Sequence, residues 1–405
     1  MQMPQTLYEP ISLKGGLDLI TPTLNLPPGV CRDSVNYEAL ETGGYARIQG
    51  YERFSGQPKP SDAVFGLIFL ASFTNPVAVG DTITNGTATG VVIAVTTGYI
   101  VYTKLASGTF AVGDAITVGA TPIGTMITPT SAIGAKLTAR YTALAADNYR
   151  ADISKPTGSG RIRSVFVYND IAYCIRDNAG GTAAVLYKQT AGGWSAVTLF
   201  HEVSFTAGGT ATPLDTQTLT QGGVTATIRR VVTETGAWTG TATGRFIISN
   251  ISGGNFAAGA ATVTTSGATL TISGIQTQIT LSPGGKGEAV QANFFGQASG
   301  TRIYHADGVN RLFEFDGTTL VPISTGGLIP RHVVAHLRYL FYSVNSSIFY
   351  QGVGNPYTAV GGGEIATGDT VVGFLVMPGS QTTGTLAVLN RNSTNMLYGT
   401  APGSW

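Results

Sequence analysis

The residues whose types and spacing could bind a metal are two histidines. His332 and His336 are four residues apart, as in a zinc-protease helix, but position 333 is Val where that motif needs Glu. The run HVVAHLRYLFYSV that contains them has the composition of a β-strand. Four residues along a strand span about 13 Å, so the two side chains are too far apart to ligate one ion. The sequence therefore predicts no metal site.

Carboxylates are the second group to weigh. A glycosidase needs two of them at a defined separation in a cleft, and the candidates nearest to each other are Asp307, Glu314 and Asp316. Asp307 and Asp316 both precede Gly, so turn formation accounts for both aspartates. A glycosidase that acts on surface glycans stays an alternative, and replacing these three residues would test it.

Two further catalytic patterns are incomplete. The Gly-rich segment GGKGE at 284–288 lacks the preceding strand, the following helix and the Ser or Thr of a phosphate-binding loop, so we expect a turn there. The chain also has no Gly-x-Ser-x-Gly nucleophile motif. We predict that the chain is not an enzyme, with no catalytic residue, no cofactor and no bound metal.

The elements that would position any site are short antiparallel strands. Residues 161–168, 171–176 and 183–188 alternate between apolar and polar side chains, and Trp194 begins a fourth run. Alternation that is cut by Asn, Asp and Gly every few residues is typical of an antiparallel meander. The two-residue link Asn169-Asp170 also indicates a tight hairpin between the first two strands.

Segments of the same kind recur over 302–321, 332–360 and 370–405. In four places an aromatic strand, a small or polar turn and a bulky residue follow one another: LYKQTAGGW, LFEFDGTTL, IFYQGVGNPYTAV and LYGTAPGSW. Repeats of about 40–50 residues, each of about four strands, are typical of β-propeller blades. We predict an all-β fold with a β-propeller-like body, and a β-sandwich with similar hairpins is the alternative.

Two Thr-, Gly- and Ala-rich regions interrupt this pattern, at 74–137 and 201–280. Both contain a strand, a Gly-x-Phe-Ala turn and another strand, which predicts two related small β-domains inserted into the body. The body itself is expected to comprise 57–73, 138–200 and 281–405, with the apolar run AVFGLIFLASF at 63–73 as a buried blade strand. Residues 139–153 have the best helix propensity in the chain and are expected to form a connector.

Composition excludes several classes of protein. Gly accounts for 55 of the 405 residues and charged residues for only 11%, which favours strands and turns over helices. The net charge is +1 and the Lys and Arg residues are scattered, so the chain is not a basic nucleic-acid-binding protein. No secretory signal and no membrane span are expected. Cys31 and Cys174 are expected to stay free, the second as a buried thiol.

Residues 1–56 are Pro-rich at first and are expected to form an N-terminal arm, which either closes the ring of blades or docks on a neighbour. The motifs of this arm are Gly15-Gly16-x-Asp18, Thr21-Pro22, Leu26-Pro27-Pro28-Gly29, Asn36-Tyr37-Glu38 and Gly43-Gly44-Tyr45-x-Arg47-Ile48-x-Gly50-Tyr51-Glu52-Arg53. In these motifs the chain resembles the opening of tail proteins from short-tailed bacteriophages, a group that includes tail nozzles and packaged-DNA-stabilisation (tail tubular) proteins. The segments at 160–188, 329–336 and 391–400 are similar to propeller blades of that group.

The resemblance implies a structural protein of the virion, made in the bacterial host cytoplasm and located in the tail. It implies a homo-oligomeric ring, expected to be a hexamer, below the portal and the adaptor, with tail fibres or spikes as further candidate neighbours. Such a nozzle extends the tail channel, retains packaged DNA and permits its ejection without sequence-specific binding. Contacts between subunits are expected at Tyr45, Arg47, Tyr51 and Arg53 of the arm. A tail module that binds a host receptor or a glycan is the alternative.

Overall fold

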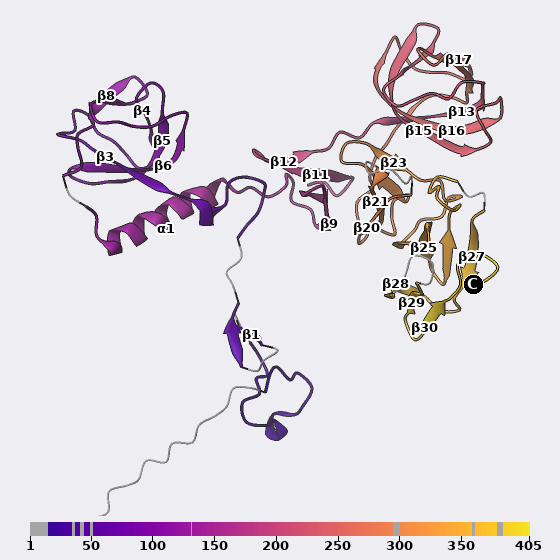
Figure 1. Cartoon of the computed structure of the whole chain (residues 1–405), viewed down its shortest axis with the longest axis horizontal. Helices are drawn as coiled ribbons and strands as arrows, with labels where there is room; N and C mark the ends of the chain where they lie inside the picture. Colours follow the sequence, from indigo (N-terminus) through magenta and orange to yellow (C-terminus); the bar gives the residue numbers. More distant parts are fainter. Residues whose placement is uncertain are drawn as a thin grey trace, which may run out of the picture. The chain divides into compact units, whose positions relative to one another are not determined.

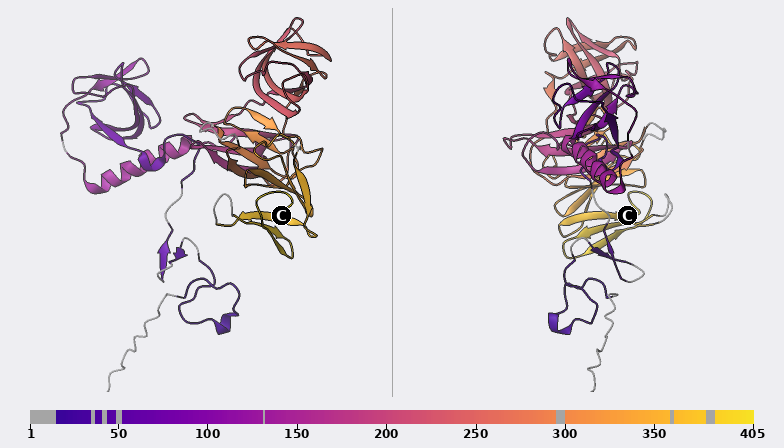
Figure 2. Two further views of the ribbon diagram at one scale, coloured as in Figure 1. Left: turned by 45° about the vertical axis from the view of Figure 1, so that its right-hand side comes forward. Right: turned by 90° about the vertical axis from the view of Figure 1, so that its left-hand side faces the viewer.

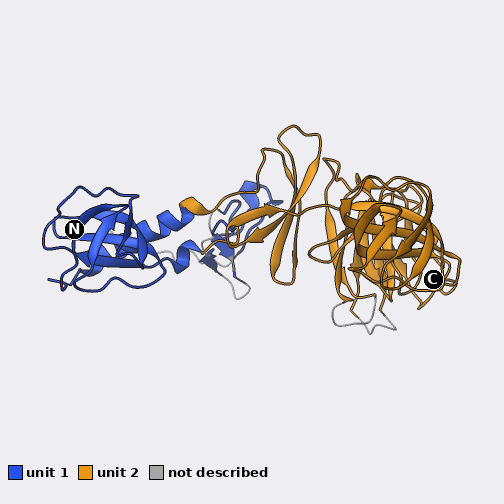
Figure 3. Cartoon of the chain, turned by 90° about the horizontal axis from the view of Figure 1, so that it is seen from above, with its two compact units in different colours: residues 1–54, 59–150 blue, residues 55–58, 151–405 orange. Residues whose placement is uncertain are grey.

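The structure is nearly all β, as the sequence predicts, and is known here as a computed structural model (Figure 1). It describes residues 15–34, 37–40, 44–48, 52–130, 132–294, 300–358, 361–378 and 384–405. The chain divides into two compact units, one of residues 1–54 and 59–150 and the other of residues 55–58 and 151–405 (Figure 3). Within the described ranges, no helix combines the length and the apolar character that crossing a membrane requires.

The arm contains a small hairpin in the first unit. Strand β1 (Tyr37–Ala39) pairs antiparallel with β2 (Tyr45–Arg47), and a short 3₁₀ turn, η1 (Thr23–Asn25), precedes them. The arm motif that begins at Gly43-Gly44-Tyr45 thus includes β2, and its residues 49–51 fall outside the described residues. The partner of β2 is β1, and no strand of the described part of the arm joins a sheet of the second unit.

The rest of the first unit is a closed six-stranded barrel with a helix. Its strands are β3 (Phe65–Phe69), β4 (Thr82–Thr84), β5 (Thr89–Val95), β6 (Tyr99–Ala106), β7 (Ala115–Val118) and β8 (Thr121–Thr125). They pair in the order β3-β6-β5-β4-β7-β8, and a bridge between Leu70 and Met126 brings the last strand back to the first. Inward-facing Ile68, Ile83 and Ile100 are fully buried in its core.

This barrel corrects two expectations about the body. The apolar run at 63–73 is not a blade strand, because its residues 65–69 form β3 and pair with β6. The first small β-domain therefore begins before residue 74. A short 3₁₀ turn, η2 (Pro60–Asp62), precedes the barrel in the chain, and the helix α1 (Ala135–Asp152) follows it. The helix packs Tyr141 and Ala145 against Val101 of the barrel wall.

A second barrel occupies residues 201–278 of the second unit. Its strands are β13 (His201–Gly208), β14 (Thr218–Gln221), β15 (Val224–Thr235), β16 (Ala242–Ser252), β17 (Gly259–Val263), β18 (Ala268–Ile272) and β19 (Thr277–Gln278). The order β16-β15-β14-β17-β18-β13 closes through pairing of β13 with β16. Figure 2 shows from two further sides how these strands wrap around one another. This is the strand order of the first barrel, so the predicted relation between the two small β-domains extends to their topology.

Matching irregularities strengthen this relation. Each barrel has a bulge at the same place in its central hairpin, between Val92 and Ala94 in β5 and between Ile228 and Arg230 in β15. The turn before β4 is also repeated before β14: Gly80 N–H bonds the Val92 carbonyl at 2.9 Å, and Thr216 N–H bonds the Ile228 carbonyl at 2.8 Å. Bulges and turns of this kind set strand direction, so their repetition indicates that the two barrels have the same fold.

Four meander sheets make up the rest of the second unit. The first contains β9 (Ile162–Tyr168), β10 (Ile171–Asp177), β11 (Ala184–Thr190) and β12 (Gly193–Ala196). The second contains β20 (Glu288–Ala292), β21 (Arg302–Ala306), β22 (Phe313–Phe315) and β23 (Leu320–Pro322). The third contains β24 (His332–His336), β25 (Tyr339–Val344), β26 (Ser347–Tyr350) and β27 (Gly363–Ala366). The fourth contains β28 (Val371–Val376), β29 (Leu386–Asn390) and β30 (Thr394–Leu397).

The predicted hairpins are confirmed in these sheets. Asn169 and Asp170 have φ values of 48° and 59°, the pair of positive values that a two-residue type I′ link requires. Strand follows strand antiparallel in every sheet. Cys174 on β10 is buried, and both it and Cys31 are free, as expected.

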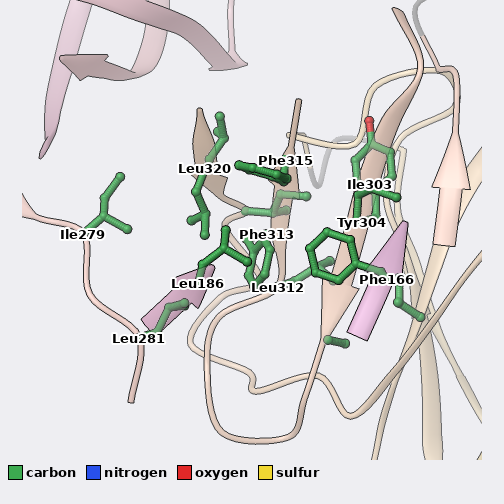
Figure 4. Packing of buried hydrophobic residues seen from close by; sticks show 14 of the residues in the cluster. Phe166, Leu186, Ile279, Leu281, Ile303, Tyr304, Leu312, Phe313, Phe315 and Leu320 are labelled. Carbon is green, nitrogen blue, oxygen red and sulfur yellow. The ribbon is translucent and has the colours of Figure 1, made fainter. Parts of the chain in front are cut away.

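The first strands of the four sheets lie in a row. Strand β9 contacts β20, β20 contacts β24, and β24 contacts β28. Their starting ends lie together, because Gly287 N–H bonds the Arg163 carbonyl at 3.0 Å and His332 Nδ1 lies 2.7 Å from Glu288 Oε1. One apolar core joins the first three of these sheets, with Phe166, Phe313 and Phe315 at its centre (Figure 4).

Candidate functional site

The candidate assembly surface is the loop of residues 15–31 in the arm. Backbone hydrogen bonds close it, from Asp18 N–H to the Cys31 carbonyl and from Cys31 N–H to the Gly16 carbonyl, each at 2.9 Å. Tyr45 holds the same two sides, because its hydroxyl donates to the carbonyls of Gly16 at 2.6 Å and Gly29 at 3.2 Å. These hydrogen bonds give the loop a defined backbone shape.

The apolar side chains of this loop point to solvent. Ile20 is 94% exposed and Leu24 98% exposed, and Leu19 is also largely exposed. A loop that is ordered by hydrogen bonds but leaves several large apolar residues uncovered has the character of an interaction surface. Burying one such side chain contributes about 1.5–3 kcal/mol, so three of them amount to a substantial share of a subunit contact.

The four residues predicted for subunit contacts fall into different settings. Arg47 and Arg53 are exposed, whereas Tyr45 is half-buried and is occupied within the arm. Tyr51 lies outside the described residues. Sequence reasoning missed Ile20 and Leu24, and the signal that could have found them is the apolar run LDLITPTLNL between two Gly- and Pro-rich turns.

Two of the three carboxylates weighed for catalysis, Glu314 and Asp316, belong to a buried ion network. Arg230, from β15 of the second barrel, reaches the second meander sheet and donates from Nη1 to Glu314 Oε1 at 2.6 Å and from Nη2 to Asp316 Oδ2 at 2.5 Å. The hydroxyl of Tyr357 donates to Glu314 Oε2. Asp307 is occupied elsewhere, because its oxygens accept from the backbone of Val309 and from both the backbone and the side-chain amide of Asn310.

Burial controls the electrostatics of this network. Glu314 is completely buried, which raises the pKa of its carboxyl, while the Arg230 guanidinium acts in the opposite direction. Burial also acts to raise the pKa of Asp316, but backbone N–H bonds from Thr319 and Thr318, together with Arg230, outweigh it and hold that pKa below its usual range. Glu314 is enclosed by protein, and its ion pair with Arg230 links the second barrel to the second meander sheet.

A second arginine strengthens the same junction. Arg245 of β16 pairs with Glu202 at 2.5 Å and Glu234 at 2.9 Å, and its Nη2 donates to the Pro322 carbonyl at 2.7 Å. Sequence reasoning overlooked both arginines. The signal was present in β15, where Arg230 follows buried Ala226 and Ile228 in alternation, because a charge on a buried face needs a partner.

The histidines are strand residues, as the sequence predicts. His332 and His336 lie at the two ends of β24, and His332 pairs with Glu288. In the part of the chain that the structure describes, no group of three or more His, Cys, Asp and Glu side chains is placed to hold a metal ion.

A polar cavity of about 370 Å³ lies where β9 and β20 end. Its lining is made of hydrogen-bonding side chains and includes Asn169, Gln291 and Arg302, with the phenol of Tyr168 at one side. Such a lining suits a hydroxyl-rich ligand better than an apolar one.

Comparison with known proteins finds little. No protein-family model matches the chain, and no curated protein matches it. One similar solved structure is a crystal structure of BBS1N in complex with ARL6DN, soaked with lead, with 13% sequence identity over 61% of this chain and 80% of that chain. The TM-score of this match is 0.21, so the likeness carries no argument.

Proposed function

We propose that this chain is a structural subunit of a bacteriophage tail, in which several copies form a nozzle ring below the portal and adaptor. The ring extends the channel, retains packaged DNA and releases it on infection. The four meander sheets of the second unit act as consecutive blades of a propeller-like body. Support for this arrangement comes from the row of first strands, since the first strand of each blade lies innermost in a propeller.

The arm loop is the observation that carries the proposal. Its fixed shape and its uncovered Ile20 and Leu24 suit a contact with a neighbouring subunit, and the motifs around it are those that resemble tail proteins. Rings form when one surface patch repeatedly meets a different patch on the next copy, and the exposed apolar side chains of the arm loop offer one such patch.

The decisive experiment is electron microscopy of the assembled virion with this subunit located. The expected result is a ring on the tail axis below the adaptor. Density for the subunit away from the axis would reject the proposal.

A second experiment tests the arm directly by light scattering of the purified chain with portal and adaptor. Ile20→Asp with Leu24→Asp should abolish ring assembly, because a charge at each position opposes burial. Ile275→Asp is the matched control, since Ile275 is 59% exposed on the second barrel and should tolerate the change. Equal loss of assembly in both variants would contradict the role of the arm.

The polar cavity favours a second candidate function, binding of a glycan on the host surface. A glycan array probed with the purified chain separates the two candidates. Binding that is lost in Gln291→Ala, together with a position off the tail axis, would replace the ring proposal by this one.

A further inference from the structure

Four exposed basic residues lie near the starts of the first strands of the four meander sheets, three of them just before the strand and one in a turn beside it. Arg161 directly precedes β9, Lys286 stands two residues before β20, and Arg331 directly precedes β24. The fourth, Arg391, lies in the turn after β29, and its N–H bonds the carbonyl of Thr370, the residue before β28, at 2.9 Å. Each sheet therefore places one cation at the start of its first strand.

These four starts lie at one end of the row of first strands. The bond from Gly287 to Arg163 joins the starts of β9 and β20, and the pair of Glu288 with His332 joins those of β20 and β24. Val371 N–H bonds the Asn345 carbonyl at 2.9 Å, which brings the start of β28 to the same end, because β25 runs back along β24. We call Arg161, Lys286, Arg331 and Arg391 the basic rim.

The cations of the basic rim are available for a partner. None of the four forms a salt bridge to another residue that the structure describes, and all four side chains are exposed. Of the carboxylates nearby, Asp177 is balanced by Arg163 at 2.5 Å. Glu288, which lies against His332, and Asp307, which accepts from the amide of Asn310, each offset part of the positive charge of the rim.

Asp369 is a further carboxylate at this end of the row, and the hydrogen bonds that it accepts come from neutral groups. It accepts from the backbone of Asn392 and Thr370, and these bonds, with a smaller effect of Arg391, lower the pKa of its carboxyl. It therefore remains charged at neutral pH and offsets part of the rim, which leaves a modest excess of positive charge.

We propose that the basic rim binds the phosphate backbone of double-stranded DNA without reading its sequence. Single cations repeated along a row of strand starts suit a polymer whose charges also repeat. None of the four residues is aromatic or an amide, so they provide no stacking platform for unpaired bases and no amide that reads adenine. Arginine can also read guanine, and the comparison of two unrelated duplexes below tests that. Four contacts give a weak, salt-dependent grip, which a moving duplex can break and re-form.

This inference extends the proposed function but does not need it, because the alignment of the strand starts comes from hydrogen bonds within the chain. Electron microscopy of the virion tests the ring, and DNA binding in solution tests the rim. Either result can therefore fail while the other stands.

The test is fluorescence anisotropy of two unrelated, labelled 30-base-pair duplexes with the purified full chain, between 50 and 200 mM NaCl. Four phosphate contacts predict a slope of log affinity against log salt of about −3.6, which weakens binding about 150-fold over that range. The two duplexes should bind equally. The variant R161Q/K286Q/R331Q/R391Q should lose most of the binding and of the slope.

The matched control is K59Q/K136Q/R140Q/R338Q, which removes four exposed cations from other places and should bind as the unchanged chain does. Circular dichroism of both variants checks that they fold. Equal loss in the control would show a general charge effect and overturn the proposal. So would a preference for one duplex, or binding of phosphatidylglycerol vesicles with no binding of DNA.

Discussion

Replacing Arg230 with Met should weaken the junction between the second barrel and the meander sheets by several kcal/mol. Arg230 contributes its charge to Glu314, Asp316 and, at 3.2 Å, Asp215. Glu314 is completely buried, so removal of Arg230 leaves its carboxylate with neither water nor its closest cation, and Arg302, whose Nε lies 3.5 Å from Glu314 Oε1, compensates only in part. Breaking a buried pair in this way costs about 3–5 kcal/mol.

The pH dependence of the stability lost in Arg230→Met provides a second, independent test of the same reasoning. Arg230→Met removes the largest effect that opposes burial, so the pKa of the Glu314 carboxyl rises further even though the Tyr357 hydroxyl and Arg302 still lower it. The folded state of the variant therefore favours the protonated form more than that of the unchanged chain does. The destabilisation should therefore be largest at neutral pH and shrink as the pH falls towards the raised pKa. For the same reason, Glu314→Gln added to Arg230→Met should recover part of the lost stability.

Urea denaturation at pH 7 measures the free energy, and hydrogen exchange of 224–235 and 313–316 locates the loss. Arg229→Met is the matched control, because Arg229 is the next residue of β15 and bonds Ser249 and the ring of Phe200 rather than the buried acids. It should cost no more than about 1 kcal/mol. A loss in Arg230→Met no larger than in Arg229→Met would refute the reasoning.

Three further predictions concern single residues. His305 is buried between Phe313 and Phe166, and burial lowers its pKa from 6.5 to about 4, so the unfolded chain binds more protons between these values. Stability should fall by up to about 3 kcal/mol as the pH drops from 6.5 to 4, and His305→Leu should flatten that part of a pH series of urea midpoints. Tyr45→Phe removes the two hydrogen bonds that hold the arm loop and should cost the loop about 1 kcal/mol, seen as faster limited proteolysis within 15–31; unchanged cleavage would count against the role of Tyr45. Burial raises the pKa of the Cys174 thiol to about 11, so Cys174 should react with a thiol reagent only after unfolding, whereas half-buried Cys31 should react first; simultaneous reaction would disprove the burial.

Local structure could be predicted from the sequence because its signals are local. The hairpin of β9 and β10 follows from alternating side chains and from Asn169-Asp170, whose backbone must take positive φ values. The Gly-x-Phe-Ala turns at 108–111 and 254–257 similarly indicated two related β-domains, which the strand order then extended to whole barrels.

Tertiary structure decided which strands meet and what the charged residues do. The apolar composition of the run at 63–73 suits a blade strand and a barrel strand equally well. Only its pairing with β6, thirty or more residues later in the sequence, shows that it is a barrel strand. Glu314 and Asp316, the partners of Arg230 in the second meander sheet, lie more than eighty residues away in the sequence, and no local pattern specifies them. The four cations of the basic rim are scattered along the chain and gather because four first strands start at one end of the row. Side-chain alternation fixes the face on which a residue lies, whereas contacts between distant segments fix what that face meets.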